Sequence, residues 1–169
     1  ASADGDLYIN ASTDAAVGGN LNVTATTGNI RQGRAVAVAG TSSFTTSANN
    51  ANINLSRTDN AFTGAVALNT TGSNGNATID GGTTALNMAA STVGGNLSAT
   101  ATTGNVTQWG ALSVTGTSSY TTSANNAYIA LSRTDNAFTG AVSLNTTGSS
   151  GHAIVDNGIT ALNLAASSV

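Results

Sequence analysis

A tandem duplication of 76 residues constrains the fold of this 169-residue chain more than any other feature. Val17–Leu21 returns as Val93–Leu97, and Leu55–Val66 returns as Leu131–Val142. Residues 17–93 and 93–169 are identical at 56 of 77 aligned positions. Tandem repeats of this length build solenoids or arrays, in which each unit buries its apolar side chains against its neighbours. The sequence therefore predicts one continuous stack.

The 76-residue repeat divides the whole chain into four parts. Residues 1–16 are the end of a preceding repeat, 17–92 are repeat one, 93–168 are repeat two, and residue 169 starts the next. Leu7-Tyr8-Ile9 resembles Leu86-Asn87-Met88 after a shift of three residues. We therefore expect the chain to be a window into a longer array.

Apolar side chains within one repeat come in short groups at every second position, which is the period of a pleated strand. Clusters of Thr, Gly, Asn and Ser, which favour turns, separate these groups. No stretch carries the stripe of an amphipathic helix. The nine groups of repeat one are Leu21/Val23, Ile30, Val36/Val38, Phe44, Ile53/Leu55, Phe62, Val66/Leu68, Ala77/Ile79 and Leu86/Met88.

Strands this short are best satisfied by parallel pairing with a counterpart one coil away, at a spacing of about 4.8 Å. Three strands in a triangular coil give about three coils of roughly 25 residues per repeat, and roughly seven coils in the chain. The sequence predicts an all-β fold, a right-handed parallel β-helix or β-solenoid.

Differences between the two repeats indicate which side chains face inward. Phe44 becomes Tyr120 and Ile79 becomes Val155, exchanges of similar volume that a packed core tolerates. Asn52 becomes Tyr128, a change of character that indicates a solvent-facing position. Asparagines at matching places on successive coils predict ladders of side-chain hydrogen bonds. The candidates in repeat one are Asn20, Asn29, Asn49, Asn50, Asn60 and Asn69.

Composition excludes several classes of function. The chain has four arginines, no lysine and a net charge of -3, which leaves no basic surface for nucleic acid or for anionic membranes. It has no cysteine, so disulfides, thiol catalysis and cysteine zinc sites are excluded. No apolar run approaches the roughly 20 residues that span a bilayer.

Candidate sites are few. Solenoid enzymes that act on polysaccharides need clustered acids and bases, whereas this chain has no glutamate or lysine. The recurring pairs Arg57/Asp59 and Arg133/Asp135 predict solvated turns with a local ionic contact. His152 and Trp109 stand where the other repeat has Asn and Gly, which indicates surface exchange. We therefore predict no catalytic, cofactor-binding or metal-binding residue, and no enzyme.

Two weaker patterns remain open. Asp4-Gly5-Asp6 resembles part of a calcium loop, but it lacks the remaining ligands of an EF-hand. Thr24-Ala25-Thr26 and Thr100-Ala101-Thr102 suggest an outward threonine rank of the kind that binds ice, although other coils do not continue it.

Blocks such as Val93–Gln108 and Gly110–Gly116 resemble the repeats of filamentous haemagglutinin-like bacterial surface proteins. The resemblance covers the entire chain. It implies a secreted or surface-held β-helix that projects from a Gram-negative cell, often exported by the two-partner route. The prototype has 19-residue repeats, and 76 is four times 19, so a solenoid with four coils per repeat stays open.

These observations lead to a functional expectation: a rigid stalk of a giant extracellular bacterial adhesin. The alternative is an extracellular fibre, sheath or matrix protein that assembles by end-to-end stacking of coils. Ice binding or polysaccharide binding is a third option. The expected partners are neighbouring repeats of the same chain and possible further copies, with surface glycans unspecified.

Overall fold

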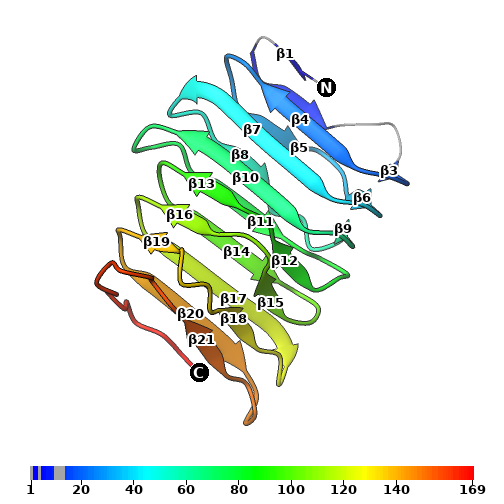
Figure 1. Cartoon of the computed structure of the whole chain (residues 1–169). Coiled ribbons are helices and arrows are strands. Elements are labelled where there is room, and N and C mark those ends of the chain that lie inside the picture. Colours follow the sequence, from blue (N-terminus) through cyan, green and yellow to red (C-terminus); the bar gives the residue numbers. More distant parts are fainter. Residues whose placement is uncertain (1, 4, 10–13) are drawn as a thin grey trace.

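The computed structural model describes residues 2–3, 5–9 and 14–169, which form short strands joined by turns; no helix occurs in these segments. The strands stack along one axis between the two termini (Figure 1). Named strands pair in parallel with strands one coil away, as β11 does with β8 and β14. The predicted all-β solenoid is confirmed.

A sheet that contains every third strand of the chain defines the coils. Its seven strands span six turns, and each register advances by one coil of 20 to 24 residues, for example Ala77 to Leu97 or Ser118 to Val142. The strands are β2 (Leu7–Ile9), β5 (Ile30–Gln32), β8 (Ile53–Leu55), β11 (Ala77–Asp80), β14 (Leu97–Ala101), β17 (Ser118–Asn125) and β20 (Val142–Thr147).

The second sheet has eleven strands and divides in the middle of the molecule. There β12 and β13 both stack on β10, which pairs Val66 with Met88 and Asn69 with Thr92. The strands are β1 (Ser2–Ala3), β4 (Leu21–Ala25), β7 (Ser42–Asn49), β10 (Val66–Thr71), β12 (Leu86–Met88), β13 (Ser91–Val93), β15 (Val106–Gln108), β16 (Leu112–Val114), β18 (Ile129–Leu131), β19 (Ala137–Phe138) and β21 (Ala153–Val155).

A third, small sheet closes the coils of repeat one. It contains β3 (Ala15–Val17), β6 (Val36–Val38) and β9 (Ala61–Phe62). Beyond β9, the rows that begin at β12 and β13 supply the other two sides of each coil. In the coil of β10 and β11 between these two parts, the third side is held by an isolated bridge between Ala61 and Gly82.

The strand count corrects the predicted coil geometry. Three coils separate β4 from β12 and β13, and the chain then continues to β14 on the next side, so a 76-residue repeat is three and one third coils of about 23 residues instead of three coils of 25. As a consequence, β4 lies in the eleven-stranded sheet, whereas its repeat-two equivalent β14 lies in the seven-stranded sheet. Equivalent residues of successive repeats are thus turned by one third of a revolution about the axis.

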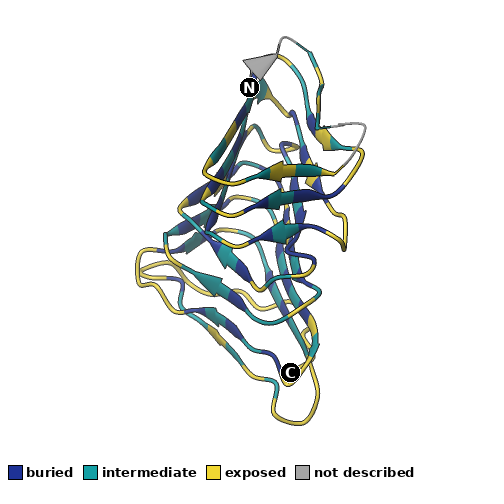
Figure 2. Ribbon diagram, turned by 90° about the vertical axis from the view of Figure 1, so that its right-hand side faces the viewer, coloured by how far each residue is buried: buried dark blue, intermediate teal, exposed yellow. Residues whose placement is uncertain are grey.

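The core runs along the inside of the stack (Figure 2). Residues alternate between buried and outward along the strands, as in β8, where Ile53 and Leu55 are buried and Asn54 is exposed. The predicted core groups are confirmed, with Leu21 only partly buried at the start of its stack. The core of each repeat contains an edge-to-face aromatic pair, Phe44 with Phe62 and Tyr120 with Phe138, each at 6.1 Å between ring centroids.

A column of side-chain hydrogen bonds runs along one corner and crosses the boundary between the repeats. The backbone N–H of each residue donates to the side-chain oxygen one coil earlier, at 2.7 to 2.8 Å. A ladder is thus confirmed for two of the predicted candidates, Asn29 and Asn96, the repeat-two equivalent of Asn20. Asn52 and Asn76 belong to it although the sequence did not predict them there. Its members, in order, are Asp6, Asn29, Asn52, Asn76, Asn96 and Thr117.

Asn60 and Asn136 do not join this ladder, although the sequence suggested it for Asn60. Their side chains point inward and are buried. The Asn136 carboxamide oxygen accepts from Leu112 N–H and Gln108, and its NH₂ donates to Gln108 and to the carbonyls of Leu131 and Asp156. Asn60 makes the same set of bonds in repeat one. Each amide thereby ties three consecutive coils together.

Candidate functional site

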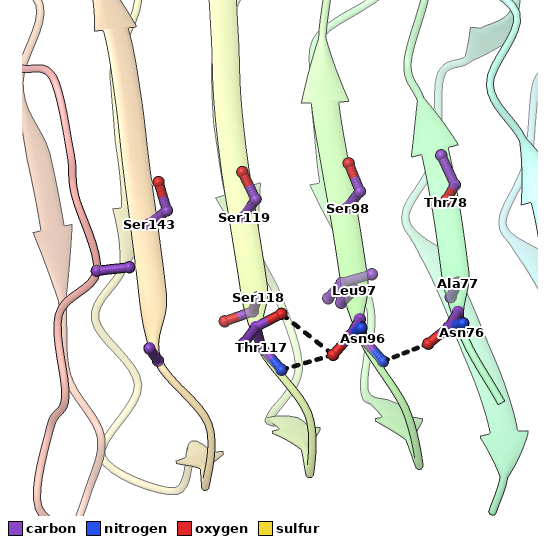
Figure 3. A pocket seen from close by; sticks show the side chains of 12 residues that line it. Asn76, Ala77, Thr78, Asn96, Leu97, Ser98, Thr117, Ser118, Ser119 and Ser143 are labelled. Atoms are coloured by element: carbon purple, nitrogen blue, oxygen red, sulfur yellow. Dashed lines mark hydrogen bonds between the residues drawn. The ribbon is translucent and has the colours of Figure 1, made fainter. Parts of the chain in front are cut away.

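A shallow groove of about 540 Å³ lies over β11, β14, β17 and β20 on the outside of the seven-stranded sheet (Figure 3). Its floor carries one hydroxyl per coil, in register from strand to strand. These residues are Thr78, Ser98, Ser119 and Ser143. The groove has neutral polar and small apolar walls, so it offers hydrogen bonds but no acid or base.

The asparagine column forms one edge of this groove. Figure 3 shows Asn76, Asn96 and Thr117 on successive coils, joined by hydrogen bonds. Because the carboxamide oxygens of Asn76 and Asn96 accept backbone N–H groups of the next coil, they hold the turns in register. The column serves the stack, and the groove is a product of the same regular stacking.

The two predicted ion pairs are confirmed as local contacts. Arg133 donates two parallel hydrogen bonds to Asp135, at 2.8 and 2.7 Å, and Arg57 does the same to Asp59. These bonds lower the pKa of each carboxyl below its ordinary value. All four groups are exposed, so each pair contributes little to stability.

The rotation of the repeat separates these two pairs. Arg57 follows β8 in the seven-stranded sheet, whereas Arg133 follows β18 in the eleven-stranded sheet. They therefore lie at different corners of the rod and do not form one charged face.

The Asp4-Gly5-Asp6 segment is only partly described, because Asp4 lies outside the described residues. The Asp6 carboxylate accepts hydrogen bonds from Asn29 N–H and from Arg31, which lower its pKa. Its oxygens are engaged within the stack. Among residues 2–3, 5–9 and 14–169 no group of three His, Cys, Asp or Glu side chains could hold a metal ion.

Trp109 and His152 lie on the surface, as the sequence predicted. The Trp109 side chain is 71% exposed, and its backbone is fixed because its N–H donates to the Met88 carbonyl at 2.7 Å. His152 is exposed and stacks on Tyr128, with 5.2 Å between ring centroids and an angle of 14° between planes.

The stacking of His152 on Tyr128 was not predicted from the sequence. In repeat one the same two positions hold Asn52 and Asn76, which form a rung of the asparagine column. A hydrogen-bonded amide pair has therefore been replaced, in both members, by a stacked ring pair. The signal lay in two exchanges one coil apart, which becomes visible only when the coil length is known.

Comparisons with known proteins give one family and no further relative. A family model described as repeats of unknown function (DUF5649) matches residues 2–69 and again residues 74–145. No curated protein and no solved structure matches the chain. In the described part of the chain, no helix is long and apolar enough to cross a membrane.

Proposed function

We propose, because the chain belongs to the family of DUF5649 repeats, that it is one stretch of a rigid solenoid shaft, the stalk of an adhesin held at a bacterial surface or secreted from it. The observation that carries the proposal is the unbroken stack across the repeat boundary. The seven-stranded sheet continues from β11 to β14 in full register, and Asn76 bonds Asn96 across the same step. No hinge interrupts the rod at this boundary.

The surface fits this role. The groove on the seven-stranded sheet carries hydroxyls and amides without charge, and the Arg/Asp turns are internally paired. The acids Asp6, Asp59 and Asp135 are each engaged by an arginine, which supports a structural role without catalysis. Neighbouring repeats of the same chain are the main partners that we propose, with no nucleic acid and no membrane.

A fibre built by coils stacking between chains is the alternative. The parallel pairing that stacks one coil on the next within this chain, as β15 stacks on β12, is the contact that would join coils of two copies.

Ice binding is not favoured by the geometry. Thr24 lies on β4 in the eleven-stranded sheet, whereas Thr100 lies on β14 in the seven-stranded sheet. The rotation of one third of a turn per repeat therefore moves the threonine pattern to a different side, and a flat rank does not extend along the rod.

Imaging of single molecules tests the shaft. Chains lengthened by whole 76-residue repeats should appear as straight rods, each repeat adding about 16 Å, from three and one third coils of about 4.8 Å. Flexible beads would refute the shaft. Filaments whose length does not depend on the number of repeats per chain would favour the fibre instead.

A further inference from the structure

The exchanges between the two repeats concentrate on one outward face. In repeat one, β5, β8 and β11 present a row of polar side chains, one per coil, formed by Arg31, Asn54 and Thr78. In repeat two, β15, β18 and β21 present the equivalent row. That row consists of Thr107, Ala130 and Ile154, and Ile154 is 52% exposed.

The residues at the two ends of this row also become less polar or larger in repeat two. Three rings lie at the two ends of this row: Trp109 directly follows β15, and Tyr128 and His152 directly precede β18 and β21. The repeat-one residues at these flanking positions are Gly33, Asn52 and Asn76. Every ring on this face of repeat two therefore replaces a glycine or an amide.

We propose that this aromatic face, defined as Thr107, Trp109, Tyr128, Ala130, His152 and Ile154, binds a neutral β-linked oligosaccharide. An exposed indole and a stacked pair of rings offer flat apolar surfaces with polar edges, which match the C–H faces and the hydroxyl rims of pyranose rings. The row between them follows flat, parallel strands, and a β-1,4-linked chain is a flat ribbon that can lie along it.

Charge on the face matches a neutral ligand. Repeat two has Thr107 and Gly110 where repeat one has Arg31 and Arg34, so both arginines of that region are absent from this face. Arg133 stays beside the face, where its Nη1 donates to the Trp109 carbonyl at 3.3 Å, but it is neutralised by Asp135. This planar, paired group supplies hydrogen-bond donors and acceptors for sugar hydroxyls without net charge.

The size of the face also favours a small ligand over a second copy of the chain. Three coils at about 4.8 Å and four residues at about 3.3 Å give an area on the order of 10² Å². A stable protein interface needs about 800 Å² on each partner. The face is therefore too small to hold a dimer, but it is large enough for a short oligosaccharide.

Trp109 makes the test direct, because it is the only tryptophan in the chain. We expect chitotetraose or cellotetraose to change the Trp109 emission in a saturable manner in the full chain. The double variant Tyr128→Asn/His152→Asn, which carries the repeat-one residues, should weaken binding by about tenfold, the value of one stacked ring. Arg133→Ala should weaken it too, whereas the matched control Arg57→Ala should not.

Three outcomes would overturn the proposal. The first is an emission that is insensitive to both saccharides while circular dichroism shows a folded chain. The second is equal binding by the double variant, which would place the sugar elsewhere. The third is an emission change that depends on protein concentration and accompanies dimers in sedimentation, which would assign the face to self-association. None of these results bears on the rod length that tests the shaft.

Discussion

At the scale of single residues, a comparison of equivalent positions in the two repeats shows which substitutions the fold accepts. Positions that keep their volume lie inside, as Ile79 and Val155 do, and positions that change character lie outside, as Asn54 and Ala130 do. Some buried exchanges depart from this pattern, as Gly81 and Asn157 do. Phe44 is replaced by Tyr120, which adds a hydroxyl at a fully buried site.

The Tyr120 hydroxyl and the nearby Ser118 hydroxyl are buried without a hydrogen bond of good geometry in the described structure. A buried, unsatisfied hydroxyl costs about 1–3 kcal/mol. We therefore expect Tyr120→Phe, which restores the repeat-one residue, to raise the free energy of unfolding by about 1 kcal/mol. Urea denaturation measures this, and the reverse change Phe44→Tyr should lower the midpoint. A loss of stability in Tyr120→Phe would contradict the proposed packing.

The same residue predicts a dependence on alkaline pH. Burial raises the pKa of the Tyr120 hydroxyl, and the Ser118 hydroxyl offsets this only in part. In the unfolded chain the tyrosine ionises near about pH 10, so above that pH the unfolded state binds fewer protons than the folded state. Stability is therefore complete below about pH 10 and falls as pH rises further.

The comparison with Tyr120→Phe isolates this effect from other titrating groups. At about pH 11 the wild-type chain should have lost about 1.4 kcal/mol more stability than the variant, relative to pH 8. Urea midpoints at the two pH values give the difference. Equal losses in both proteins would show that Tyr120 is accessible to solvent.

A substitution of the buried Asn136 should lower the free energy of unfolding, whereas Tyr120→Phe should raise it. The Asn136 carboxamide oxygen accepts two hydrogen bonds, and the two hydrogens of its NH₂ group are shared among three acceptors. A carboxylate cannot donate these bonds, so Asn136→Asp should destabilise the chain by about 3 kcal/mol. The exposed change Asn54→Ala, natural in repeat two, should cost less than about 0.5 kcal/mol. Thermal unfolding of both variants checks this contrast.

At the scale of elements, the sequence predicted nine of the ten strands in a repeat. The strand missed was β13, because its inward positions are Ser91 and Val93 rather than two apolar residues. Ser91 is buried because its hydroxyl accepts from Leu68 N–H and donates to the Ala89 carbonyl. Apolar periodicity cannot reveal an inward serine whose hydroxyl bonds to backbone groups. With β13 missed, the nine remaining strands, at three strands per coil, gave a predicted repeat of three coils.

Turns between elements depend on close approach of successive coils. A Cβ on Gly116 would lie 2.7 Å from the carbonyl carbon and oxygen of Gly95, one coil earlier, so backbone would have to move. We expect Gly116→Ala to destabilise the chain by about 1–3 kcal/mol through overpacking. Gly19, whose Cβ would meet nothing within 4 Å, is the matched control, and Gly19→Ala should be nearly neutral. Equal effects in urea would argue against this close contact.

At the scale of the whole molecule, the missed strand changes the symmetry of the array. The sequence showed the repeat, the stacking and the core, since these follow from apolar periodicity and turn residues. The rotation of the repeat about the axis could not be predicted, because it depends on a count of strands that includes β13. The aromatic face could not be predicted for the same reason. Its residues are scattered in sequence, and they are seen to be neighbours only when the coil length of about 23 residues is known.

The rotation predicts a spacing that can be measured. Three repeats contain 30 strands, or ten complete coils, so position 54 should return to the same side of the rod after three repeats, about 48 Å along the axis. A repeat of three exact coils would instead place it about 43 Å away. Spin labels at residue 54 and at its equivalent three repeats later, in a chain extended by two further copies of residues 93–168, distinguish the two distances.

Labels in adjacent repeats provide the control for this measurement. Residues 54 and 130 are separated by three and one third coils and face different sides, so their distance should exceed the axial rise of about 16 Å. A distance equal to the axial rise would mean that every repeat presents the same face in the same direction. With the rotation, a shaft of many repeats presents the equivalent positions of successive repeats in three directions in turn.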